Sequence, residues 1–340
     1  FKEVVEGLFA SGLLKVVYAT ETLALGVNLP ARSVVIEKLT KFNGNTHVTL
    51  TPGQFTQLTG RAGRRGIDKE GDALVCWSPT MPFADVARLA SSQDFVLRSA
   101  FRPTYNMVAN LVATRSQGEA QLLLSRSFGQ FQMDRGAGES RSLVGALEAR
   151  LRVLEGRGMT NGWHLEPRGR PLVQVFNEAD LLVVESLACG LLDDLGPADL
   201  AAVVSCLTYR RRGSARTEVV NTTGEVKQRI LGIIELAGAL GAEERRHAIP
   251  PAEPPDAGFS KAVKRWANGG DLGEVLGDTW SGGEFVRNVR LVADLLGQLA
   301  EVGTISVARS AHRAIETLER GVVTLSGTFD ASLAETDLES

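Results

Sequence analysis

Residues 51–68, TPGQFTQLTGRAGRRGID, combine a helix start signal with a dense group of arginines and glycines. Thr51 can cap a helix, Pro52 suits its first turn, and Gln54 stands where it can complete a capping box. The pattern therefore predicts a helix that runs from about Pro52 to Ala62.

Arg61 and Arg64 stand near the end of this predicted helix. Because they are three residues apart, they are expected on roughly the same side of it. Gly60 and Gly63 allow a backbone or a ligand to approach closely. Guanidinium groups remain charged, pair bidentately with phosphate oxygens and stabilise charge on a transferring phosphoryl group. The two arginines are a candidate phosphate-binding fork, and the alternative is a solvated basic helix end.

Two strings in this region resemble helicase motifs. QLTGRAGRRG at 57–66 resembles motif VI of superfamily 2 helicases, QxxGRAGRxG, and VVYATETLALGVNLPA at 16–31 resembles motif V. With KFNG at 41–44 between them, they resemble the superkiller-type DExH RNA helicases, especially bacterial members of an actinobacterial kind. The resemblance implies the C-terminal portion of such an enzyme.

The resemblance implies a nucleotide site between two RecA-like domains. Gln57, Arg61 and Arg64 would reach the phosphates of ATP and serve in catalysis, while Gly26 and Asn28 would lie near the nucleotide. Without the motif, Gly26 and Asn28 could equally form a simple turn. ATP and Mg²⁺ would be bound mainly by the first RecA-like domain.

The same resemblance implies contacts with a nucleic-acid strand. Thr20 and Glu21 would face its backbone and the domain cleft, although Thr20 could simply satisfy backbone groups at a strand end. A helix is predicted at 282–302, with Ser281 and Glu284 at capping-box spacing and an apolar stripe made of Phe285, Val289, Val292, Leu296 and Leu299. Arg287 and Arg290 lie on its opposite, polar face, and by resemblance this would be the ratchet helix lining the RNA channel. The alternative is a solvated face. Arg211, in a run of arginines after a predicted helix, either contacts phosphate or complements the helix dipole.

Residues 1–80 alternate helices with short apolar strands, which argues for a parallel sheet covered by helices. The expected strands are Leu14–Ala19, Ser33–Glu37 and Asp72–Trp77. By resemblance, residues 1–82 form the latter half of a second RecA-like domain of the P-loop NTPase type.

The rest of the chain has helical patterns. SAFRPTYNMVANL and LLLSRSFGQFQ resemble a winged-helix region, expected at 83–176 with a shortened or missing arch insertion. EADLLVVESLACGLLDDLGPADLAAVVSCLTYRRR resembles the DSHCT helical (ratchet) domain, expected at 177–325 before an acidic tail at 326–340. The fold class is thus a partial α/β RecA-like domain followed by mostly α winged-helix and helical-bundle domains. Gly118–Phe131 is expected to form one helix. Residues 163–176 are expected to form the wing or a connecting hairpin.

Four aromatic residues of the winged-helix-like region have two possible uses. They could stack on the bases of a single strand, but their helical spacing favours core packing. They are Phe101, Tyr105, Phe128 and Phe131.

Composition places few limits on function. The 340 residues suffice for two or three domains, and 44% apolar and 23% charged residues are ordinary for a globular protein. The net charge of −3 argues neither for nor against nucleic acid.

No apolar run approaches a membrane span, so a cytoplasmic protein without membrane contact is expected. Three scattered cysteines suggest buried, reduced thiols. The start at Phe1, inside an amphipathic pattern, is typical of a fragment.

Two ATPase motifs do not occur in the sequence. It contains no GxxxxGK(S/T) and no Asp-Glu pair that could form a DExH box, so the chain is expected to be inactive alone. In the intact enzyme the resemblance implies ATP-driven, 3′ to 5′ unwinding of single-stranded RNA in processing or decay, by a monomer that works with an RNA-decay nuclease. The alternatives are a DNA helicase of the same superfamily and a non-catalytic nucleic-acid-binding or scaffold module.

Overall fold

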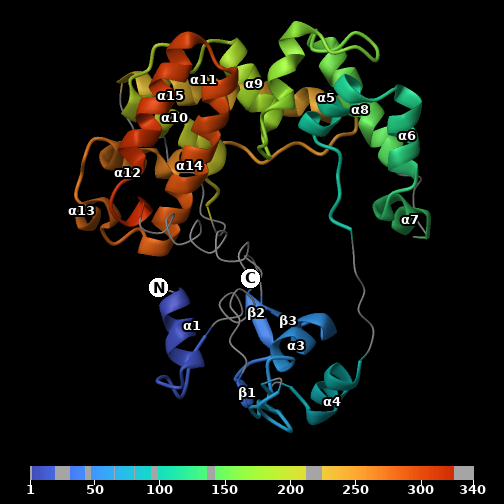
Figure 1. The fold of residues 1–340 in the computed structure, drawn as a ribbon. Helices are drawn as coiled ribbons and strands as arrows, with labels where there is room; N and C mark the ends of the chain where they lie inside the picture. The colour runs from blue at the N-terminus through green and yellow to red at the C-terminus, as the bar shows by residue number, and fades with distance from the viewer. Residues whose placement is uncertain are drawn as a thin grey trace. The chain divides into compact units, whose positions relative to one another are not determined.

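The computed structural model divides the chain into two compact units, unit 1 at Phe1–Arg98 and unit 2 at Ser99–Ser340 (Figure 1). The structure describes residues 2–19, 31–42, 47–64, 66–79, 81–92, 99–135, 142–211 and 224–324.

Unit 1 contains the predicted parallel pairing. Strand β1 (Ser33–Ile36) runs parallel to β4 (Asp72–Val75), with Ser33 opposite Asp72 and Ile36 opposite Val75. These two strands confirm two of the three that the sequence predicts. The third was wrong, because Leu14–Ala19 has no strand geometry. An apolar run forms a strand only where a neighbour pairs with its backbone, and no strand among the described residues pairs with this segment.

The other elements of unit 1 are short. They are α1 (Lys2–Ala10), the antiparallel pair β2 (Thr40–Phe42) and β3 (His47–Thr49), α3 (Pro52–Thr59) and α4 (Phe83–Ser91). Their small core consists of Ile36, Leu39, Leu50 and Phe55. Val86 and Leu89 of α4 pack against this core, so unit 1 extends past residue 82, where the first domain was expected to end.

Unit 2 is helical throughout its described residues. Its elements are α5 (Tyr105–Thr114), α6 (Gln117–Ser125), α7 (Phe128–Arg135), α8 (Leu143–Gly156), the 3₁₀ helix η1 (Pro167–Val173), α9 (Asp180–Ala188), α10 (Pro197–Thr208), α11 (Gly224–Arg246), the 3₁₀ helix η2 (Ala257–Phe259), α12 (Ser260–Ala267), α13 (Leu272–Leu276), α14 (Gly282–Val302) and α15 (Ile305–Leu318). The mostly helical character predicted for this part is confirmed.

Two local predictions in unit 2 need correction. The expected helix at 118–131 is two helices, because the Ser127 hydroxyl accepts the Gln130 N–H at 3.2 Å and starts a new one. Residues 163–176 contain η1 in place of the expected wing or hairpin. Among the described residues from 99 to 176 the extended pairing is limited to a single bridge between Thr160 and Leu165.

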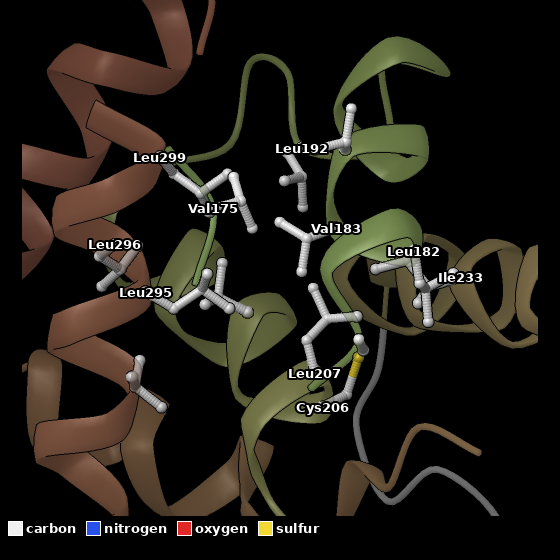
Figure 2. Packing of buried hydrophobic residues seen from close by; sticks show 14 of the residues in the cluster. Val175, Leu182, Val183, Leu192, Cys206, Leu207, Ile233, Leu295, Leu296 and Leu299 are labelled. Carbon is white, nitrogen blue, oxygen red and sulfur yellow. The ribbon is translucent and has the colours of Figure 1, made fainter. Parts of the chain in front are cut away.

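One hydrophobic core extends through unit 2, from Tyr105 to Val323. Figure 2 shows part of it, where Leu295, Leu296 and Leu299 of α14 lie near Val175 and opposite Val183. The helices expected to form two domains, at 83–176 and 177–325, therefore share one core from residue 99 onward.

A network of charged side chains lies inside this unit. Glu185 of α9 is 1% exposed, and its Oε2 lies 3.0 Å from Arg168 Nη2 and 3.4 Å from Arg157 Nη1. Arg157 also pairs with Glu243 of α11 at 2.5 Å. The network connects α8, η1, α9 and α11, and nothing in the sequence pattern indicated it.

Asp180, at the start of α9, is a second buried carboxylate. It is 3% exposed, and it accepts the backbone N–H of Asn106 at 2.6 Å and that of Leu181 at 2.8 Å. Burial raises the pKa of Asp180 from 3.8 to about 6, in spite of these two hydrogen bonds.

The raised pKa of Asp180 makes stability depend on pH. Between pH 3.8 and about 6 the folded chain holds a proton that the unfolded chain has lost, so the free energy of unfolding should fall as pH rises through this window. The two-unit shift corresponds to about 3 kcal/mol at most. We expect Asp180→Asn, which cannot ionise, to lose this part of the pH dependence in urea unfolding between pH 4 and 7. The exposed Asp278→Asn should retain it. Parallel profiles for the wild type and Asp180→Asn would contradict the assignment.

Candidate functional site

The arginine motif begins with a capped helix. The Thr51 N–H donates to Gln54 Oε1 at 2.9 Å, and the Gln54 N–H donates to Thr51 Oγ1 at 3.3 Å, which confirms the predicted capping box. However, α3 ends at Thr59, so its predicted extension to Ala62 was wrong. The chain leaves the helix at Gly60 and turns toward another segment.

Residues 60–64 and 66–68, which we call the arginine loop, contact the end of the motif V-like string through backbone hydrogen bonds. The Ala31 N–H donates to the Arg61 carbonyl at 3.0 Å, and the Gly63 N–H donates to the Ala31 carbonyl at 2.7 Å. Arg61 and Arg64 are therefore held by a backbone-paired loop. Their spacing predicted a shared side of one helix, and this prediction was wrong because the helix ends before them.

Two glycines allow this loop to lie against β4. Gly63 has a φ of 89°, a conformation that favours glycine. A Cβ on Gly71 would lie 2.3 Å from Gly63 N and 2.6 Å from the Ala62 carbonyl oxygen. Only a residue without a side chain fits at 71, so β4 and the arginine loop are in direct backbone contact.

Arg64 is paired with Asp68 inside the loop. Its Nε donates to Oδ2 at 2.8 Å, its Nη2 donates to Oδ1 at 2.9 Å, and its backbone N–H donates to Oδ2 at 2.9 Å. The hydrogen bonds from Arg64 lower the pKa of Asp68 to about 2, and the same pairing raises the pKa of Arg64. Asp68 was missed as a site residue, although its position four residues after Arg64 is a spacing at which such pairs form.

The structure brings together three of the predicted nucleotide-site residues. Gln57 is exposed on the last part of α3, Arg61 is half-buried and Arg64 is exposed on the loop that follows. Gly26 and Asn28 lie outside the described residues.

Of the predicted strand contacts, Thr20 and Glu21 also lie outside the described residues. Helix α14 has the predicted cap, since the Ser281 hydroxyl accepts the Glu284 N–H at 3.3 Å. Arg287 on its polar face is exposed and Arg290 is half-buried.

The predicted apolar stripe of α14 is confirmed, because every member is buried in the core of unit 2. The stripe consists of Phe285, Val289, Val292, Leu296 and Leu299.

A groove of about 490 Å³ lies along the polar face of α14, with Phe176 on one side and Asp294 and Gln298 on the other. The Phe176 N–H donates to Gln298 Oε1 at 2.7 Å, and Gln298 Nε2 donates to Asp294 Oδ2 at 2.9 Å. Neither Arg287 nor Arg290 lines this groove.

Arg211 lies beside acidic residues of the segment that precedes α12. Its Nε is 3.5 Å from Asp256 Oδ2, and the neighbouring Arg210 Nε is 3.6 Å from Glu253 Oε2. Carboxylates therefore partly neutralise this basic run.

The aromatic residues of α5 to α7 do not all enter the core. Tyr105 is buried and donates its hydroxyl to Glu244 at 3.1 Å. Phe128 and Phe131 are each 47% exposed with ring centroids 6.2 Å apart, and the Arg135 guanidinium lies 4.3 Å from the Phe131 ring. Core packing was therefore the wrong prediction for these two residues and for Phe101, which is 37% exposed.

Among the described residues, no three His, Cys, Asp or Glu side chains gather as metal ligands would. Within the same residues, no helix combines the length and the apolar character of a membrane span. The predicted burial of cysteines was right for Cys206 but wrong for Cys76 and Cys189, which are exposed.

Two family descriptions match the chain. The helicase conserved C-terminal domain matches residues 2–66, and the DSHCT (NUC185) domain matches residues 163–326. The match at 2–66 includes both helicase-like strings, and the match at 163–326 includes α9 to α15. This agrees with the predicted fold class of a RecA-like region followed by a helical DSHCT region.

Individual relatives are helicases. The chain is similar to the probable helicase HelY of Mycobacterium tuberculosis, with 28% identity over 95% of this chain and 61% of that protein. That alignment spans 551 positions, more than the 340 residues of this chain, so a long part of the relative has no counterpart here. The chain spans about 61% of the length of that relative.

Shorter matches extend the comparison. The probable helicase HelY of Mycobacterium leprae is 59% identical over 40% of this chain and 15% of its own length. The human superkiller complex protein 2 is 40% identical over 47% of this chain and 13% of its own length. The chain therefore carries the conserved C-terminal helicase domain and the DSHCT domain, and it is similar to helicases of the superkiller type.

Proposed function

We propose that this chain is the C-terminal part of an ATP-dependent RNA helicase that moves 3′ to 5′ along single-stranded RNA during RNA processing or decay. The observation that carries the proposal is the arginine loop, which holds Arg61 and Arg64 on backbone paired with Ala31. Its two guanidinium groups lie at the end of a capped helix, in a motif that this helicase family shares.

The arginine loop fits a triphosphate. Gln57, Arg61 and Arg64 would contact its phosphates, and the guanidinium groups would stabilise negative charge on the phosphoryl oxygens. Gly26 and Asn28 would lie close to the nucleotide. ATP with Mg²⁺ supplies the hydrolysis that drives movement, and a first RecA-like domain with a P-loop would hold most of it. This chain alone is expected to be inactive.

RNA would contact both units. Thr20 and Glu21 would meet the RNA backbone in unit 1, while Arg287, Arg290 and Arg211 are the candidates in unit 2. The human relative, superkiller complex protein 2, is by its name part of a complex, which supports a protein partner for this chain. We propose that this partner is an RNA-decay nuclease. We further propose a cytoplasmic monomer.

The test is the ATPase activity of the full-length protein, with single-stranded RNA and with single-stranded DNA. We expect RNA to raise the turnover. Arg64→Ala should lower kcat at least about tenfold, or about 1.4 kcal/mol of barrier, because it removes charge stabilisation of the phosphoryl group. Arg88→Ala is the matched control, since it removes an exposed arginine that pairs with Asp85 in the same unit. Its kcat should stay unchanged.

Each alternative has its own outcome in this test. If DNA stimulates the ATPase turnover more strongly than RNA, DNA replaces RNA as the proposed substrate. The proposal of an ATP-driven helicase then still holds. If neither nucleic acid stimulates turnover, the helicase proposal fails. If the chain then binds a partner protein with an affinity that does not depend on salt concentration, the scaffold alternative is favoured.

A further inference from the structure

We propose that Asp68 is a positioning residue for Arg64, holding one edge of the guanidinium so that the other edge is presented to a phosphate of the nucleotide. This inference rests on the proposed function, since it concerns the same nucleotide site. It adds a residue that matches no part of the helicase motif and that touches no phosphate itself.

The way in which Arg64 is held carries the inference. Asp68 accepts hydrogen bonds from Nε at 2.8 Å and from Nη2 at 2.9 Å, which is the side edge of the guanidinium. A guanidinium has five N–H donors, so the two on Nη1 and the second one on Nη2 are not used by Asp68. These remaining donors lie at the outer end, where a phosphate can pair with them bidentately.

The carboxylate is itself fixed. Asp68 Oδ2 accepts the backbone N–H of Arg64 at 2.9 Å, and the Asp68 N–H donates to the Arg64 carbonyl at 2.9 Å. The side chain of Asp68 is 10% exposed, whereas that of Arg64 is 44% exposed. The acid therefore forms the inner part of the pair and the guanidinium the outer part.

Asp68 also ties the arginine to a rigid piece of backbone. The loop that carries both residues is paired with Ala31 through Arg61 and Gly63, and Gly63 lies against Gly71. An arginine side chain loses considerable rotamer freedom when it binds a ligand. Holding it beforehand removes part of that loss, so its donors are already in place when charge develops on the phosphate.

Asp68 would have the opposite role if it competed with the nucleotide. Its carboxylate would then occupy the Arg64 donors that a phosphate needs. The edge-on geometry argues against it, because a competing carboxylate would take the outer donors. The pKa of Asp68 near 2 means that the pair stays ionised at neutral pH, so the positioning effect should not change between pH 6 and 9.

The test is RNA-stimulated ATPase of the full-length protein carrying Asp68→Asn. An amide has one acceptor oxygen in place of two, so it cannot hold both Nε and Nη2. We expect kcat to fall about fivefold, with KM for ATP changed less than about twofold, because the loss is in the transition state. Asp68→Glu keeps the carboxylate and should recover at least about half of kcat.

A double-mutant cycle separates positioning from a structural role. In an Arg64→Ala background, Asp68→Asn should cause no further loss of kcat, because its effect passes through Arg64. Asp85→Asn is the matched control, since it breaks another Arg–Asp pair of unit 1, at 2.7 Å from Arg88. It should leave kcat and KM unchanged.

The outcomes distinguish this inference from the proposed function. With an active wild type, an unchanged or higher kcat in Asp68→Asn would overturn the positioning role alone. Equal losses in the wild-type and Arg64→Ala backgrounds would do the same, as would an Asp68→Glu variant that recovers nothing. A wild type without RNA-stimulated turnover would overturn the proposed function and this inference together.

Discussion

Replacing Glu185 with alanine should lower the free energy of unfolding of unit 2 by about 2–3 kcal/mol, because it removes a buried carboxylate that two arginines share and leaves a cavity in its place. Glu185 is 1% exposed and lies between Arg157 and Arg168. Arg157 keeps Glu243, but that single carboxylate cannot replace the one inside the network. Urea unfolding followed by tryptophan fluorescence measures the change, since Trp266 is buried in the same core.

A matched control shows whether burial causes this effect. Glu225 pairs with Arg229 at 2.9 Å on α11, but its side chain is 54% exposed. Glu225→Ala should cost less than about 1 kcal/mol, because the lost carboxylate is exposed and Arg229 keeps its hydrogen bonds to the Gly190 and Asp193 carbonyls. Similar losses for the two variants would contradict the special role of the buried network.

Features that depend on neighbouring residues could be predicted from the sequence. The capping box of α3 needs only Thr51 and Gln54, which are close in sequence. The buried stripe of α14 follows from helical periodicity, and β1 and β4 from short runs of apolar residues. In each case the pattern contains the physical cause, so prediction and structure agree.

Features that depend on distant partners could not be predicted. The end of α3 at Thr59 reflects pairing of the following loop with Ala31, which lies far away in the sequence. The same limit applies to Glu185, whose arginine partners come from other elements. Phe128 and Phe131 have core-like spacing but are each 47% exposed, because periodicity does not show what packs against a face.

Only part of the candidate site could be predicted from the sequence. The string with Gln57, Arg61 and Arg64 predicts a nucleotide site on α3 and the loop that follows it, because it resembles a helicase motif. It did not show that Arg64 is already held by Asp68, since a surface aspartate near an arginine is common and its geometry depends on the turn. The fixed arginine is the property that the structure adds.

Gly71→Ala should disrupt the arginine loop and lower the stability of unit 1 by about 3 kcal/mol or more. Its Cβ would stand 2.3 Å from Gly63 N and 2.4 Å from the Ala62 carbonyl carbon, and both atoms belong to backbone that cannot rotate away. Separating the loop from β4 breaks the hydrogen bond from Gly63 to Ala31, so hydrogen exchange at the Gly63 amide should accelerate. Gly7→Ala, with open space around its Cβ in α1, should be neutral or stabilise by up to about 1 kcal/mol. Undiminished protection of the Gly63 amide in Gly71→Ala would show that the glycine contact does not hold Arg61 and Arg64 in place.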